Sequence, residues 1–256
     1  MTMKVLVCIK RVPAVAGRIV LTEDARAIDT RHLGFAIGPH EECAVEEAVR
    51  LVEGNGGEAV VLTLGPAEAA EQLRDAMAIG VARAIHLVTD GEEWDPESTA
   101  AAMVEAIRAD EQATGPFDLV LLGNEAADSG GFQVGIRVAR ALGRPTIGGV
   151  KALRVAAGTA RCEQEVPGGR DVYELPLPTV VSVLEGLNVP RFPSVPGRLR
   201  AKSRPVAVSS PPRPVQRLEL LSLEVPQAPA RRAVILGHGP DAAPAVVEFL
   251  GTLGVL

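Results

Sequence analysis

Aromatic residues are scarce in this 256-residue chain, where Phe, Trp and Tyr together make up 3% of the residues. Proteins that bind single-stranded nucleic acid stack the bases on aromatic side chains and follow the phosphates with basic ones. This chain offers few rings, and its formal net charge is −6. We therefore expect no nucleic-acid partner.

Cysteine is also rare, and Cys8, Cys43 and Cys162 lie far apart in the chain. An odd number of cysteines without a C-x-x-C spacing indicates neither a disulfide framework nor a zinc or iron–sulfur site. The 4 histidines form no H-x-x-x-H pair, and no P-C-x-x-C follows the H-x-E of residues 40–42. We expect buried thiols and no metal.

Long apolar runs are absent as well. No stretch reaches the roughly 18 apolar residues that a membrane-spanning helix needs, and the chain opens directly into an apolar strand without a signal or transit pattern. We expect a cytoplasmic protein with no membrane span. There is also no G-x-S-x-G elbow, no P-loop and no evident acid, base and nucleophile set, so we assign no catalytic residue and expect a protein without turnover of its own.

Strand and helix patterns alternate four times along the first part of the chain. This alternation predicts an α/β fold, a Rossmann-like parallel sheet flanked by helices with right-handed crossovers. With 47% hydrophobic residues, one main domain with extensions is favoured. The predicted strands are 3–9, 58–64, 83–88 and 117–123, and the predicted helices are 42–52, one that begins at residues 65–66, 97–113 and 131–142.

The loop after the fourth strand, residues 123–134, joins a buried strand to a helix through small residues. In such sheets ligands bind beyond the carboxyl ends of the strands. The backbone amides of Ser129, Gly130 and Gly131 can approach a phosphate, and the helix N-terminus adds a favourable dipole. Asp128 is suited to cap that helix or to bind a ribose hydroxyl. The same glycines also fit a purely steric role in a tight turn, so the residues alone leave both interpretations open.

Beyond residue 150 the pattern changes to short strands separated by glycine-containing turns. This pattern predicts an antiparallel excursion of hairpins, followed by one more buried strand. Glu163 and Glu165 share one face of a hairpin strand, as in ordinary solvated alternation. The predicted strands are 152–155, 160–164, 172–175 and 179–183.

A proline-rich basic segment, residues 184–205, follows the last buried strand. Pro190, Pro193 and Pro196 each fix φ and remove a backbone donor, so we predict an extended, polyproline-type recognition loop that protrudes from the body. Val195 is its expected apolar tip. The positive charge favours an acidic partner surface, and a plain solvated loop between domains is the alternative. The basic residues are Arg191, Arg198, Arg200, Lys202 and Arg204.

Residues 209–229 contain several prolines and no regular period, which is typical of an extended strap. Asp241 is suited to cap a terminal helix over residues 242–253. We therefore divide the chain into a nucleotide-binding α/β domain at 1–205, which includes the recognition loop, and a strap or C-terminal arm with its terminal helix at 206–256.

The residues N-x-P-R-F-x-x-x-x-G-x-L-x-A-K at 188–202 resemble the signature of electron transfer flavoprotein β subunits. Shorter segments are similar to that family as well, namely K-R-V at 10–12, A-V-E-E-A-V-R-L at 44–51, G-P-A-E at 65–68 and L-V-L-L-G at 119–123. The resemblance therefore covers nearly the whole chain.

The resemblance implies a heterodimeric electron carrier of fatty acid beta-oxidation. This chain would bind AMP structurally, support FAD held mainly by an α subunit, and pass electrons from acyl-CoA and related dehydrogenases towards the respiratory chain. It also implies partner-docking roles for Pro190, Arg191, Val195 and Glu165; Val195 matches a residue, typically Leu, that enters an apolar pocket of the dehydrogenase, and Glu165 faces the partner's flavin domain. The residues implied to bind the nucleotide are Cys8, Gly38, Pro39, His40, Glu41, Leu64, Gly123, Asn124, Glu125, Ala126, Ala127, Asp128, Ser129, Gly130, Gly131, Phe132, Gln133 and Val134.

The chain departs from the family at two places. Asn is common where Gly38 stands, and residues 129–131 replace a more acidic run. Flavin-bifurcating relatives hold a second FAD at the same site, so AMP and FAD both stay open. A stand-alone adenine-nucleotide-binding protein is the other alternative, but two proline-rich extensions that bury little core favour the carrier.

Overall fold

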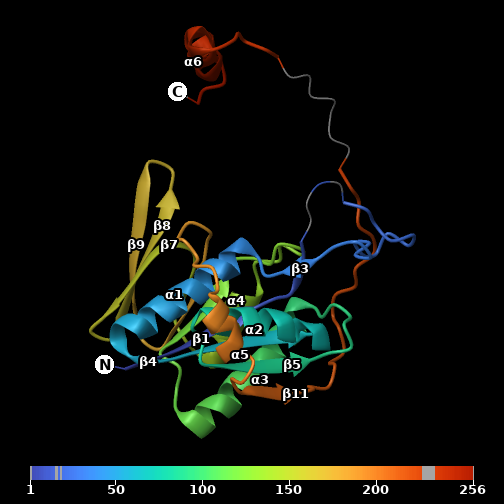
Figure 1. Ribbon diagram of the computed structural model, residues 1–256, viewed down its shortest axis with the longest axis vertical. Coiled ribbons are helices and arrows are strands. Elements are labelled where there is room, and N and C mark those ends of the chain that lie inside the picture. The colour runs from blue at the N-terminus through green and yellow to red at the C-terminus, as the bar shows by residue number, and fades with distance from the viewer. Residues whose placement is uncertain (1, 15–16, 18, 227–233, 256) are drawn as a thin grey trace. The chain divides into compact units, whose positions relative to one another are not determined.

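The computed structural model describes residues 2–14, 17, 19–226 and 234–255 (Figure 1). Its largest element is a nine-stranded sheet. The strands form from short runs rich in apolar and β-branched residues, which suit a sheet covered on both faces. In spatial order they are β11 (Val206–Ser209), β5 (Arg83–Val88), β4 (Gly57–Gly65), β1 (Met3–Ile9), β6 (Leu119–Gly123), β10 (Thr179–Val183), β7 (Thr146–Ala156), β8 (Thr159–Val166) and β9 (Gly169–Pro176).

The strands from β11 to β7 run parallel, and β8 and β9 continue the sheet antiparallel. The Rossmann-like α/β fold with an antiparallel excursion is therefore confirmed. The excursion strands are longer than predicted because the ladder continues up to the turn. Ala157 and Gly158 both have positive φ, 49° and 77°, as in the two-residue turns that suit twisted hairpins.

Helices cover both faces of the parallel part of the sheet (Figure 1). On one face lie α1 (Pro39–Asn55), α2 (Ala70–Ile79, after the 3-10 turn η1, Ala67–Ala69) and α5 (Val195–Ala201). On the other face lie α3 (Pro96–Thr114) and α4 (Val134–Leu142).

The central strand β1 shows how the core is divided. Val5, Val7 and Ile9 join the cluster under α1 and α2, whereas Leu6 and Cys8 join the cluster under α3 and α4. This is the period of two that a strand imposes on its side chains. All five are at most 3% exposed, so β1 is buried on both faces.

Local signals explain the helix ends. The Oδ1 atom of Asp95 accepts a hydrogen bond from Ser98 N at 2.7 Å, and Pro96 follows at the first helical position of α3. Helix α4 begins at Val134, later than predicted, because Phe132 has a φ of 52°, which a right-handed helix does not allow.

Residues 184–205 do not form the extended rod that was predicted. Val195 begins α5, and Ser194 caps it by accepting a hydrogen bond from Gly197 N at 3.1 Å. Pro196 lies in the first turn, where backbone N–H groups have no intrahelical partner, so proline is tolerated there. The prediction treated each proline as a helix breaker and missed this position effect.

The main compact unit continues to Leu220, beyond the boundary predicted at residue 205. Strand β11 was not predicted; it pairs in parallel with β5 at the edge of the sheet. Beyond it, Asp95 N donates to Gln216 Oε1 at 2.6 Å, and Arg217 N donates to Asp95 Oδ2 at 2.9 Å. The first part of the predicted strap is therefore bonded to the start of α3.

A second, smaller unit comprises residues 19–28 and the chain from Leu221 onward. It contains the 3-10 turn η2 (Pro240–Ala242) and α6 (Ala243–Thr252). The predicted terminal helix is present, but Asp241 is not its cap, because Ala242 holds that position and no side chain caps the helix. Residues 227–233 of the predicted strap lie outside the described residues.

Cys8, Cys43 and Cys162 are free and buried, as predicted. Within the described ranges, no helix combines the length and the apolar character that crossing a membrane requires. The same residues contain no group of His, Cys, Asp and Glu side chains arranged to hold a metal ion.

We predict that Gly197→Ala destabilises the protein, because a Cβ at this position would lie 2.2 Å from the carbonyl oxygen of Ala78 in α2. Forcing α5 away from α2 should cost about 1–3 kcal/mol in urea unfolding. Gly54→Ala is the matched control: it lies in α1 with no atom within 4 Å of the added methyl, and it should stabilise by about 0.5–1 kcal/mol. Equal unfolding free energies for the two variants would contradict the close packing of α5.

Candidate functional site

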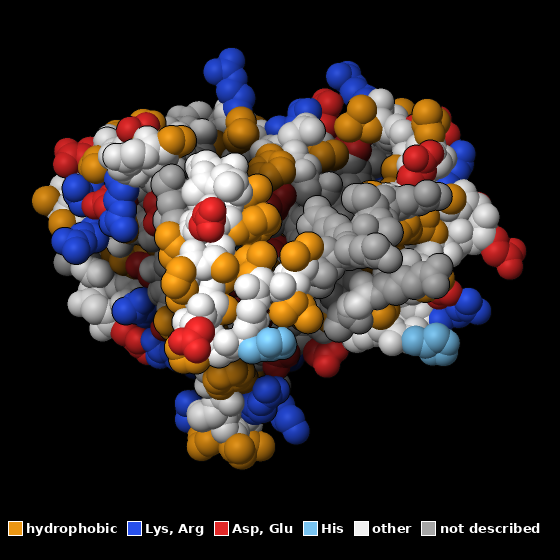
Figure 2. All heavy atoms as spheres, turned by 90° about the horizontal axis from the view of Figure 1, so that it is seen from above, with side chains coloured by type: hydrophobic (Ala, Val, Ile, Leu, Met, Phe, Trp, Pro, Cys, Tyr) orange, Lys and Arg blue, Asp and Glu red, His pale blue; other side chains and the backbone are white. Residues whose placement is uncertain are grey.

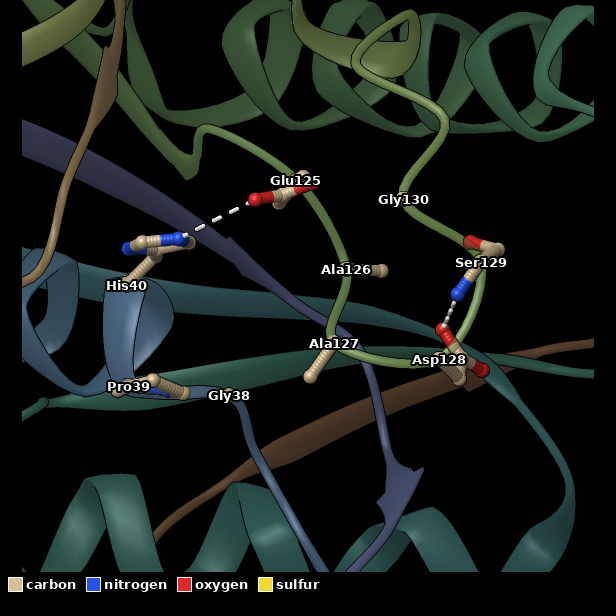
Figure 3. A pocket seen from close by; sticks show the side chains of 9 residues that line it. All are labelled: Gly38, Pro39, His40, Glu125, Ala126, Ala127, Asp128, Ser129 and Gly130. Carbon is tan, nitrogen blue, oxygen red and sulfur yellow. Dashed lines mark hydrogen bonds and ion pairs between the residues drawn. The ribbon is translucent and has the colours of Figure 1, made fainter. Parts of the chain in front are cut away.

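Loops from the carboxyl ends of β1 and β6 meet where the strand order reverses. After β1 and a small antiparallel pair, β2 (Val12–Pro13) and β3 (Phe35–Ala36), the chain enters α1 on one face, whereas β6 leads to α4 on the other. Such a switch point leaves a crevice for a ligand. A cavity of about 410 Å³ opens there, lined by Gly38, Pro39, His40, Glu125, Ala126, Ala127, Asp128, Ser129 and Gly130 (Figure 3).

All nine lining residues belong to the predicted nucleotide-binding set, so the structure brings the α1 terminus and the loop after β6 together. The other residues of that set do not line the cavity. Leu64 packs half-buried against the core, Phe132 is 52% exposed, and Asn124 Oδ1 accepts a hydrogen bond from Gly149 N at 2.7 Å. The predicted residues that do not line the cavity are Cys8, Glu41, Leu64, Gly123, Asn124, Gly131, Phe132, Gln133 and Val134.

Glu41 joins three segments behind the cavity. Its Oε2 accepts a hydrogen bond from Gly38 N and its Oε1 one from Lys10 N, both at 2.7 Å. A Cβ at Gly123 would lie 2.8 Å from Glu41 Cγ, so any side chain at the end of β6 would force Glu41 to move. The side chain therefore ties the start of α1 to the end of β1 and packs on the end of β6.

Burial raises the pKa values of two groups in this region, Glu41 and Cys8. It raises the pKa of Glu41 to about 7, although the backbone hydrogen bonds from Gly38 and Lys10 act in the opposite direction. Burial and the neighbouring Glu41 raise the pKa of the Cys8 thiol to about 12. Cys8 therefore stays a neutral core residue and cannot act as a thiolate at neutral pH.

His40 lies between the cavity and the start of the basic segment. Its Nδ1 accepts a hydrogen bond from Glu185 N at 2.7 Å, which places the proton of the neutral ring on Nε2. Nε2 lies 3.7 Å from Glu125 Oε1 on the opposite side of the cavity (Figure 3). The imidazole is thus held by one segment while it faces another.

Lys10 is a site residue that sequence reasoning missed. Its Nζ lies 2.6 Å from Glu93 Oε1 and 2.8 Å from Asp128 Oδ2. Burial alone would lower the pKa of Lys10, but Glu93 and Asp128 outweigh it and raise the pKa. The ammonium group therefore stays charged beside the cavity. A lysine directly after the central strand was the available signal in the sequence.

The loop after β6 uses some of its own amides. Ser129 N donates to Asp128 Oδ1 at 2.7 Å (Figure 3), and Gly130 N donates to Ala126 O at 2.9 Å. Asp128 thus caps its own loop rather than α4, where no side-chain cap exists. The amides open to an anion are those in the later part of the predicted stretch, residues 131–134. In the described part of the chain, no acceptor is found for the backbone N–H groups of Gly131, Phe132, Gln133 and Val134.

The residues predicted to meet a partner differ in their availability. Glu165 on β8 and Val195 at the start of α5 are exposed, and Pro190 is half-buried. Arg191 is engaged within its own chain: its Nε lies 2.9 Å from Glu46 Oε2, and its Nη1 lies 2.7 Å from Glu53 Oε1. Two carboxylates of α1 therefore already pair with the Arg191 guanidinium.

Exposed hydrophobic side chains gather in several patches on the face of the molecule that Figure 2 shows. Two elements contribute many of the exposed apolar residues. On the basic segment Val189, Phe192, Val195 and Leu199 are 88%, 96%, 73% and 62% exposed. No residue of α6 is buried, although the helix is largely apolar.

The sheet order and the cavity at its switch point define a Rossmann-like α/β protein. A model of the family described as "Electron transfer flavoprotein domain" matches residues 26–214. The chain is 36% identical over 231 residues to the electron transfer flavoprotein subunit beta of Syntrophomonas wolfei, covering 90% of this chain and 88% of the relative. It is 34% identical over 244 residues to the mitochondrial subunit beta of Oryza sativa, covering 93% and 95%.

A third relative, the subunit beta of Bradyrhizobium diazoefficiens, is 34% identical over 206 residues, 80% of each chain. The chain belongs to the electron transfer flavoprotein β-subunit family. Membership makes it part of an electron transport flavoprotein, and a β subunit implies an α subunit as its partner.

We predict that Glu41 makes stability depend on pH. Because the folded-state pKa of about 7 lies above the ordinary value of 4.5, the folded state holds a proton that the unfolded state releases between these values. Wild-type stability should therefore fall as pH rises from 4.5 to 7, by on the order of 3 kcal/mol. Glu41→Gln should lose this slope. Urea unfolding at pH 4.5, 6 and 8 measures it, and parallel curves for the two proteins would contradict the shifted pKa.

Proposed function

We propose that this chain is the β subunit of a heterodimeric electron transfer flavoprotein that holds AMP as a structural ligand in the switch-point cavity. The α subunit holds most of the FAD, which stores the transferred electrons when bound. The pair accepts electrons from acyl-CoA and related dehydrogenases and passes them towards the respiratory chain. The observation that carries the proposal is the cavity between α1 and the loop after β6, in a chain of this family.

The residues around the cavity fit a nucleotide. The open amides of residues 131–134, at the start of α4, are suited to a phosphate, since a helix N-terminus supplies free N–H groups and a favourable dipole. The carboxylates of Glu125 and Asp128 are suited to accept hydrogen bonds from ribose hydroxyls. Ala126 and Ala127 offer small apolar contacts for a base.

The second unit supports a heterodimer. Apolar side chains of α6 such as Val247 and Phe249 are 57% and 48% exposed, and a terminal helix of this composition is suited to bury itself against another subunit. In this proposal the part of the predicted arm beyond the main unit, from Leu221 onward, embraces the α subunit, and Glu165 on β8 faces its flavin domain.

The basic segment supports docking to a dehydrogenase. Val195 and Leu199 are one helical turn apart in α5, so their exposed side chains lie on the same face. Phe192 precedes this helix and is 96% exposed. We propose that this face enters an apolar site on the dehydrogenase, with Val195 as its anchor.

Nucleotide content tests the proposal directly. Denaturing the purified αβ complex and identifying the released molecules by mass spectrometry should give one AMP and one FAD per heterodimer. Two FAD would establish the bifurcating type instead, and FAD without any nucleotide attributable to this chain would overturn the structural role of the cavity.

Placing a charge among the open amides should release AMP. Gly131→Asp puts a carboxylate at the start of α4, where it repels a phosphate, and the position has neither a positive φ nor a contact closer than 3.9 Å. We expect at least a roughly tenfold loss of retained AMP, which corresponds to about 1.4 kcal/mol. Gly131→Asn is the matched control without charge and should retain AMP. Gly130 is less suitable for the test, because its φ is 56°. Equal AMP content in the Asp and Asn variants would contradict the proposal that the phosphate binds at this end of the cavity.

Docking should weaken in Val195→Ala. Burying the Val195 side chain contributes about 1.5–2 kcal/mol, most of which the truncation removes, so the affinity for the dehydrogenase should fall roughly tenfold. Val208→Ala, a change at a 64% exposed valine on β11, is the control and should be neutral. The measurement is dehydrogenase-linked flavin reduction at varied concentrations of the complex, beside reduction by dithionite. The docking role fails if Val195→Ala leaves the concentration dependence unchanged or slows dithionite reduction equally.

A further inference from the structure

The basic segment is bonded to α1 at every third residue as it leaves β10. Glu185 N donates to His40 Nδ1 at 2.7 Å. Asn188 Nδ2 donates to Cys43 O at 3.0 Å and to Glu47 Oε2 at 2.9 Å. The third bonded residue is Arg191, which contacts Glu46 and Glu53. Helix α1 therefore acts as the support on which residues 185–191 lie.

Most of the N–H groups of the Arg191 side chain donate hydrogen bonds to carboxylates of α1. Its guanidinium has five N–H groups. One on Nε is donated to Glu46 Oε2 at 2.9 Å, one on Nη1 to Glu53 Oε1 at 2.7 Å, and two on Nη2 to Glu46 Oε1 and Glu53 Oε2, both at 2.9 Å. Only one N–H is left for any other molecule.

The contact with Glu46 matters because that carboxylate is buried. Glu46 is 4% exposed, and Arg191 is the cation found beside it in the described chain. Removing the guanidinium would leave the buried carboxylate of Glu46 without its partner, which costs free energy. This cost opposes separation of the segment from α1. Glu53 is exposed to solvent, and the hydrogen bond from Arg191 lowers the pKa of its carboxyl group.

Two other cations of the segment are available for a different role. Arg198 pairs with Asp75 at 3.0 Å, but both side chains are more than half exposed. For Arg200 and Lys202 no ion pair is found within the described ranges, and both side chains are exposed. These two residues, rather than Arg191, are placed to meet an acidic partner.

We propose that Arg191 is a positioning residue that clamps the basic segment on α1 and so presents Phe192, Val195 and Leu199 in a preset arrangement, without itself contacting the dehydrogenase. This inference rests on the docking role proposed above. Presetting the segment lowers the ordering cost of docking, because the backbone is already held in place before the partner arrives. The positive charge that attracts the partner comes from Arg200 and Lys202.

The test uses the purified αβ complex as the substrate of an acyl-CoA dehydrogenase. Arg191→Gln and Glu46→Gln should each raise the KM for the complex by a factor of roughly three to ten and leave kcat unchanged. The double variant should match either single variant, because the two residues act through each other. Arg200→Gln should also raise the KM, but its effect should shrink as salt is added.

A direct contact between Arg191 and the dehydrogenase predicts a different pattern. Arg191→Gln would then raise the KM in a salt-dependent manner, Arg191→Lys would restore most of the affinity, and the buried Glu46→Gln would have no effect. That pattern would overturn the proposal. Additive effects of the two changes would overturn it as well.

Limited trypsin digestion of the complex without dehydrogenase separates the clamp from docking. Cleavage after Lys202 should be faster in Arg191→Gln and Glu46→Gln than in wild type, and unchanged in Val195→Ala. Unchanged cleavage in the first two variants would refute the clamp even if docking is real. Faster cleavage together with an unchanged KM in Val195→Ala would show instead that the docking role has failed. Unaltered FAD content confirms that each variant is folded.

Discussion

The buried carboxylate of Glu41 is the interaction on which the arrangement of the switch point depends. It accepts hydrogen bonds from the backbone of Gly38 and Lys10, and its stem packs where Gly123 leaves room for it. These three backbone positions belong to the start of α1 and to the ends of β1 and β6. Because a buried carboxylate must satisfy its oxygens, the three segments have little freedom relative to one another, and the cavity inherits its shape from them.

Helix α1 connects the cavity to the basic segment. Its first turn supplies Gly38, Pro39 and His40 to the cavity wall, and its later turns supply Cys43, Glu46, Glu47 and Glu53 to the basic segment. The same helix buries its apolar side against β1, β4 and β6. One element thus contributes to the core, to the switch-point cavity and to the support of a surface segment, so a shift of α1 changes all three at once.

The order of strands and helices could be predicted from the sequence because each element is a local pattern. Residues 83–88 and 179–183 are strands with the predicted bounds, since both are short apolar runs between clear turn signals. The nine residues lining the cavity were predicted through the resemblance, whereas glycine spacing alone left their role open.

Other features depend on contacts between distant residues. Helix α5 was missed because a proline's effect depends on its position in the first turn, and β11 because a short strand after Pro205 is stabilised by pairing with β5. The engagement of Arg191 by Glu46 joins residues 145 positions apart. The backbone amides of Ser129 and Gly130 donate hydrogen bonds within their own loop. These bonds depend on side-chain and turn geometry, which a pattern of apolar residues does not predict.

The order of strands in space also sets an order of events during synthesis. Strand β1 precedes the other strands of this sheet in the chain and lies in the middle of the parallel strands, so β4, β5 and β6 can add to it as they are synthesised. Strands β7, β8 and β9 come next, but β7 adjoins the sheet only through β10, which follows them in the chain. We therefore expect β7, β8 and β9 to pair only with one another until residues 179–183 have been made, and β5 to remain an edge strand until β11 follows.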